Sequence, residues 1–100
     1  MPAEVAVLGV GMHPWGKWGR NFVEYGVHAA RAALADAGLE WTDVHFVAGG
    51  DTMRNGYPGY VAGATFAQAL GWTGVPVTSS YGACASGAMA IEAARARILS

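Results

Sequence analysis

The stretch "VTSSYGACASGAMAIEAARAR", Val77–Arg97, decides the fold of this chain and holds its only cysteine, Cys84. It begins as a strand, passes through the small-residue turn "GACASG" and continues as a helix. A lone cysteine in apolar surroundings is more often a packing residue than a reactive one. A strand-to-helix turn, however, exposes its central side chain, and the start of a helix favours a thiolate. The placement therefore favours Cys84 as a nucleophile, and the small apolar residues after it predict that the first turns of the helix are buried.

Upstream of this stretch, the pattern predicts strands and helices in alternation. The continuous apolar run "VAVLGV" (Val5–Val10) is typical of a strand covered on both faces of a parallel sheet. A helix is expected to begin after Asn21, with Glu24 three residues later as in a capping box, and to stop at Gly38. The run "VHFVAGG" (44–50) reads as a second strand, which completes a βαβ unit.

The remaining residues continue the same alternation. "VAGATFAQALGW" (61–72) predicts a second helix, "GVPVTSS" (74–80) a third strand and "ASGAMAIEAARARIL" (85–99) a third helix. The fold class is therefore α/β. Because an α/β domain rarely stops on a helix with no strand after it, we expect residues 1–100 to be part of the N-terminal half of a longer protein.

Composition excludes several function classes. The chain has 100 residues, 53% of them hydrophobic and only 13% charged, with a formal net charge of −1. Such a balance gives no electrostatic footprint for nucleic acid or an anionic membrane surface. No signal peptide or membrane-spanning run is recognised, so we expect a cytoplasmic protein. The low share of charge predicts that further chain or a partner subunit covers much of the surface.

Two other patterns carry little functional signal. The turn "GVGMHP" after the first strand resembles a dinucleotide fingerprint, but Pro14 stands where the third glycine is needed, which favours an ordinary glycine-rich turn. The histidines His13, His28 and His45 are far apart in the sequence and lack metal-ligand spacing, so no metal site is expected. The polar helix face on which His28 lies predicts exposure, and His45 is expected at a strand end.

The glycine- and proline-rich segment "DTMRNGYPGY" (51–60) is predicted to be a loop. Its side chains Met53, Tyr57 and Tyr60 could line a bulky apolar pocket or a dimer interface. The interface is favoured, because exposed aromatic loops in obligate dimers are usually covered.

The stretches "VAVLGVGMHPWGK" (5–17), "AARAALADAGLEWTDV" (29–44) and "GVPVTSSYGACASGAMAIEAAR" (74–95) together resemble the N-terminal segment of the thiolase superfamily. The similarity is closest to the sterol-carrier-protein or lipid-transfer-protein thiolase branch and spans essentially the whole chain. Its most specific motif is "ACASG", Ala83–Gly87. Ketoacyl synthases share the fold and a cysteine at this position, but their motif usually continues with further serines or threonines.

The resemblance implies a layered αβαβα fold, usually dimeric, and an acyltransferase of lipid or steroid metabolism. Cys84 would take an acyl group from a CoA thioester, and coenzyme A itself would remove it, so CoA is a substrate and no bound cofactor is expected. The main-chain N–H of Cys84 would contribute to an oxyanion hole. In the proteins of this family the catalytic histidine and a second cysteine lie in the C-terminal half. The resemblance therefore implies that residues 1–100 alone should be inactive.

Two further functions stay open beside thiolysis. Some lipid-transfer-protein members are similar to thiolases in fold yet act as retro-aldolases on CoA-linked steroid side chains, with a small OB-fold partner protein. These enzymes need no acyl-cysteine. A third interpretation is a non-catalytic thiolase-like subunit that binds an acyl-CoA or a lipid.

Overall fold

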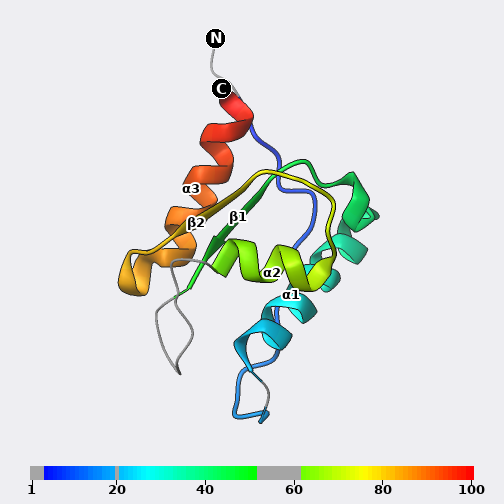
Figure 1. Cartoon of the computed structure of the whole chain (residues 1–100), viewed down its shortest axis with the longest axis vertical. Helices are drawn as coiled ribbons and strands as arrows, with labels where there is room; N and C mark the ends of the chain where they lie inside the picture. Colours follow the sequence, from blue (N-terminus) through cyan, green and yellow to red (C-terminus); the bar gives the residue numbers. More distant parts are fainter. Residues whose placement is uncertain (1–3, 20, 52–61) are drawn as a thin grey trace. The chain divides into compact units, whose positions relative to one another are not determined.

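The computed structural model describes residues 4–19, 21–51 and 62–100 (Figure 1). The chain forms two compact units: Ala6–Val44, here the helix unit, and His45–Ser100 with the first residues of the chain, here the sheet unit. The described elements, in chain order, are α1 (Phe22–Ala37), η1 (Trp41–Asp43), β1 (Val47–Gly50), α2 (Ala62–Leu70), β2 (Val77–Ser80), η3 (Ala83–Ala85) and α3 (Ser86–Leu99).

Both ends of α1, in the helix unit, are set by local sequence signals. The side-chain oxygen of Asn21 accepts a hydrogen bond from the backbone N–H of Glu24 at 3.0 Å, which caps the first turn. At the other end Gly38 is left-handed, with φ 72°. Its N–H donates to the carbonyl of Ala35, and the next N–H along donates to Leu34, as in a Schellman motif. The predicted start and stop of this helix are confirmed.

The predicted strand Val5–Val10 is wrong, because this segment has no regular secondary structure. In the helix unit its backbone lies against α1, where the N–H of Val10 donates to a carboxylate oxygen of Asp36 at 3.0 Å. A Cβ at Gly9 would overlap the backbone of Ala33, so glycine permits this close approach. An apolar run becomes a strand only when a neighbour pairs its backbone groups, and no described strand pairs with it.

The sheet unit confirms the α/β class. Strands β1 and β2 are parallel and in register from Val47↔Val77 to Gly50↔Ser80, so their carboxyl ends lie at the same edge. Helix α2 connects them, and Figure 1 shows both strands running between α2 and α3. The βαβ unit is therefore β1–α2–β2, whereas the sequence predicts one that begins at Val5.

Helices α2 and α3 cover opposite faces of this sheet. The N–H of Gly63 in α2 donates to Ser79 Oγ at 2.9 Å, so Ser79 faces α2. A Cβ on Gly50 would overlap the carbonyl of Ser86, so Gly50 faces α3. Ser79 is paired with Gly49, and successive strand residues point to opposite faces. The sheet unit is therefore a three-layer α/β/α arrangement.

The observed elements are shorter than the predicted ones. Each strand has four residues, within the predicted segments 44–50 and 74–80. Helices α2 and α3 lie within the predicted segments 61–72 and 85–99. The predicted loop 51–60, with Met53, Tyr57 and Tyr60, falls outside the described residues apart from Asp51.

Little apolar surface is buried in the described part of the chain. Ala90 is its one buried hydrophobic side chain, and Ser86, 3% exposed, is its one buried polar side chain. The predicted burial of the first turns of α3 holds for these two residues only, since the other residues of Ser86–Ile91 are exposed. Trp72 is 85% exposed. None of the helices in the described residues is long and apolar enough to cross a membrane.

Candidate active-site turn

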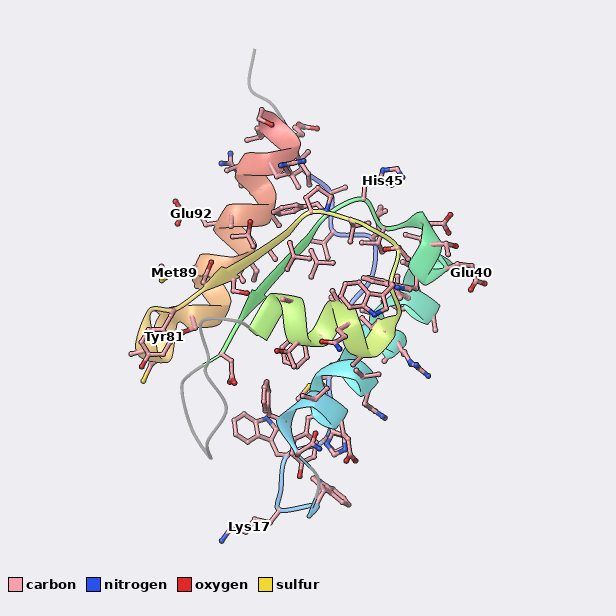
Figure 2. The ribbon with its side chains drawn as sticks, in the orientation of Figure 1. Lys17, Glu40, His45, Tyr81, Met89 and Glu92 are labelled. Carbon is pink, nitrogen blue, oxygen red and sulfur yellow. The ribbon has the colours of Figure 1, made fainter. Side chains whose placement is uncertain are left out.

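Cys84 lies at the centre of η3, the single turn that joins β2 to α3. The turn stands beyond the carboxyl edge of the parallel sheet, where ligand sites of α/β folds are commonly found. Tyr81, which directly follows β2, marks this end of the sheet in Figure 2. The thiol is free and exposed. The exposure expected of a side chain on such a turn is therefore observed.

The backbone just before Cys84 adopts a costly conformation. Ala83 has φ 49°, and it is the one non-glycine residue with a positive φ within the described ranges. A left-handed conformation costs an L-residue such as alanine roughly 1–2 kcal/mol. Backbone strain of this kind persists only where surrounding contacts hold it, and it gathers at functional sites.

The buried side chain of Ser86 holds this strained turn. Its Oγ donates to the carbonyl of Ala83 at 2.7 Å and accepts a hydrogen bond from the N–H of Gly82 at 2.9 Å. Both backbone partners lie before Cys84, and Ser86 lies two residues after it. Sequence reasoning assigned no role to Ser86. The available signal was a hydroxyl residue at the start of a helix, where side chains commonly satisfy nearby backbone groups.

The turn also presents a backbone donor. The N–H of Ala85 donates to the carbonyl of Gly82 at 2.9 Å. For the N–H of Cys84, by contrast, no acceptor is found among residues 4–19, 21–51 and 62–100. An unpaired N–H beside an exposed thiol can bind the oxygen of a carbonyl that the sulfur attacks.

None of the three histidines was expected to bind a metal, and the structure shows where each one lies. His45 precedes β1 and lies at the amino end of the sheet, as expected of a strand-end residue (Figure 2). Cys84, by contrast, follows the carboxyl end of β2. His28 is exposed, as predicted. Although His13 and His28 are far apart in the sequence, their ring centres are 4.8 Å apart in the helix unit.

One acidic residue near the turn escaped the sequence reasoning. Asp51 directly follows β1 and is half-buried. Because Gly50 is paired with Ser80, Asp51 leaves the sheet at the same edge as the turn that carries Cys84. An acidic residue directly after a buried strand was the signal that could have indicated it. No group of three or more metal-ligating side chains occurs in the described segments.

Removing the Ser86 hydroxyl is expected to loosen the turn. Ser86→Ala removes a buried hydroxyl and leaves the N–H of Gly82 and the carbonyl of Ala83 without this part-buried partner, so we expect the free energy of unfolding to fall by about 1–3 kcal/mol. Urea denaturation of the full-length protein, followed by circular dichroism, measures the change.

Ser100→Ala is the matched control. The Ser100 hydroxyl also donates to the carbonyl three residues before it, that of Arg97, at 2.8 Å, but it is exposed and water can replace it. We expect a change below about 0.5 kcal/mol for this control. Equal effects of the two substitutions would show that Ser86 does not hold the turn.

Comparison of the sequence with protein families and with curated proteins gives no match in either case.

Proposed function

We propose that this chain carries the nucleophile of a thiolase-type acyltransferase that cleaves or forms a carbon–carbon bond in a β-ketoacyl-CoA. The carrying observation is the exposed thiol of Cys84 on a strained turn, braced by Ser86, beyond the carboxyl edge of a parallel sheet. The resemblance of "ACASG" and its flanking stretches to the thiolase superfamily supplies the reaction class. A layered thiolase-like fold is part of the same proposal.

In the cleavage direction, Cys84 Sγ attacks the β-keto carbon and forms a tetrahedral oxyanion. The bond between the α and β carbons then breaks, and its electron pair leaves on the α carbon as a CoA-linked enolate, which takes up a proton. The acyl group remains on Cys84 as a thioester. The thiol of a second CoA then attacks this thioester, forms the shortened acyl-CoA and returns the Cys84 thiol.

The chain contributes two groups to these steps. Cys84 Sγ forms the covalent bond, and the N–H of Cys84, which has no acceptor among the described residues, stabilises the oxyanion as it develops. The groups that move the protons are, by the resemblance, a histidine and a second cysteine from the distal half of a longer protein. Coenzyme A acts as substrate, and no bound cofactor takes part.

Exposed apolar side chains in each unit support a larger assembly. In the helix unit Val7, Leu8 and Val10 are 81%, 68% and 68% exposed, although their sequence is typical of a buried strand. In the sheet unit Ile91 of α3 is 74% exposed. Large apolar side chains left exposed in each unit are typical of surfaces that another chain segment or subunit covers. We propose that the remainder of a thiolase-like fold and a second copy of the chain cover these apolar side chains.

Alkylation of the full-length protein tests the proposal. We expect iodoacetamide to modify Cys84 faster than a free model thiol, and a β-ketoacyl-CoA to protect it, with peptide mass spectrometry locating the label. The Cys84→Ser variant is the control for label at this position. Alkylation that is slower than the model thiol, or that acyl-CoA does not slow, would contradict the assignment.

A further inference from the structure

Two histidines that are 15 residues apart in the sequence come together in the helix unit. His13 belongs to the irregular segment before α1, and His28 lies in α1. Their ring centres are 4.8 Å apart, with an angle of 70° between the ring planes. The imidazole of His13 is half-buried and fixed by packing, whereas that of His28 is exposed and can change its orientation.

The contacts of His13 determine which of its nitrogens carries the proton. Its Nδ1 lies 2.9 Å from the carbonyl oxygen of Pro14. A carbonyl oxygen only accepts hydrogen bonds, so Nδ1 is the donor and Nε2 of the neutral ring keeps its lone pair. Metal-binding histidines commonly donate their other ring N–H to a backbone carbonyl in this way, which fixes both tautomer and orientation.

Aromatic neighbours hold His13 in place. The indole of Trp18 donates to the same Pro14 carbonyl at 2.8 Å, and its ring centre is 5.6 Å from that of His13. The ring of Tyr25 packs against His13 at 4.6 Å. His13 is therefore a preorganised imidazole, with His28 beside it.

The separation of the two rings suits a shared metal ion. Two imidazoles on one ion place their ring centres roughly 4.5–5.2 Å apart, for metal–nitrogen bonds of about 2.1 Å and ligand angles of about 90–110°. The observed 4.8 Å lies within this range. Glu24, four residues before His28 on the same face of α1, adds negative charge near the pair.

We propose that His13 and His28 together bind a divalent transition-metal ion of the kind that prefers imidazole ligands. Because no third histidine, cysteine or carboxylate completes the group among the described residues, water fills the other positions. Affinity follows the Irving–Williams order, with Cu²⁺ above Ni²⁺, and Mg²⁺ and Ca²⁺ do not compete because they prefer oxygen ligands. The bound ion would join the glycine-rich segment before α1 to the helix. This proposal is independent of the function proposed for Cys84.

Titration of the untagged full-length protein with Cu²⁺ tests the site, in a Cys84→Ser background so that the thiol does not bind the metal. We expect one equivalent of Cu²⁺ to bind through these residues, with hyperfine coupling to two imidazole nitrogens in its electron paramagnetic resonance spectrum. We expect His13→Ala and His28→Ala each to weaken Cu²⁺ binding at least about tenfold and to remove the hyperfine coupling of one imidazole nitrogen. His28→Ala changes an exposed helix residue.

His45→Ala is the matched control, because His45 is an exposed histidine of the sheet unit. It should leave the affinity and the spectrum unchanged. Circular dichroism of His28→Ala verifies that the helix is intact. Binding that survives both His13→Ala and His28→Ala, or that His45→Ala weakens equally, would overturn the proposal. Full competition by Mg²⁺ would overturn it as well, since it would indicate an oxygen-ligand site.

Discussion

Cys84→Ala is expected to lower the thiolysis rate of the full-length protein by about 10³-fold or more, because under the proposed function the sulfur of Cys84 forms the acyl-enzyme bond. The fold should be unaffected, since the Cys84 side chain is exposed. The measurement is the release of shortened acyl-CoA from a β-ketoacyl-CoA, with the thermal unfolding midpoint recorded beside it.

The same variant separates the other two functions from thiolysis. A retro-aldolase acting on a steroid side-chain CoA thioester needs no acyl-cysteine, so its aldol cleavage would survive Cys84→Ala. A non-catalytic acyl-CoA-binding subunit would show no turnover in either form and little change in affinity. Cys84→Ser serves as the isosteric control, because it keeps the size of the side chain and removes the sulfur nucleophile.

Gly50→Ala is expected to lower the free energy of unfolding by about 1–3 kcal/mol. A Cβ at the end of β1 would overlap the carbonyl of Ser86 and approach the backbone of Gly87, and backbone atoms cannot move aside as a flexible side chain can. Relief requires that α3 move away from the sheet, which also shifts the turn held by Ser86. We therefore expect slower alkylation of Cys84 in this variant, measured beside urea denaturation.

Gly87→Ala is the matched control for Gly50→Ala. Gly87 lies one position after Ser86 in α3, and a Cβ there meets open space. Because alanine is a better helix former than glycine, this variant should be as stable as the parent or more stable by up to about 1 kcal/mol. A Gly50→Ala variant as stable as Gly87→Ala would show that β1 does not pack closely against the start of α3.

Elements with local signals could be predicted from the sequence. The helix α1 begins after Asn21 and ends before Gly38 because a cap side chain and a left-handed glycine act on their immediate neighbours. The turn at Cys84 was likewise predicted, because the small residues around it permit a sharp bend between a strand and a helix. In both places the deciding interactions join residues that are close in sequence.

Pairing partners could not be predicted in the same way. The run Val5–Val10 has the composition of a buried strand, yet no described strand pairs with it. Its backbone at Gly9 lies beside α1, and the N–H of Val10 bonds to Asp36. An apolar run shows that a segment can be buried, but a strand forms only where another strand supplies hydrogen-bond partners. The four-residue lengths of β1 and β2 reflect the same dependence on a partner.

By itself the sequence determined the α/β class, the ends of α1 and the position of Cys84 between strand and helix. Only the tertiary structure decided that β1 pairs with β2, that Gly50 approaches the start of α3, and that His13 meets His28. The physical reason is the range of the interactions. Caps and turns act over a few residues, whereas strand pairing, close backbone approach and ring contacts join residues that only the folded chain brings together.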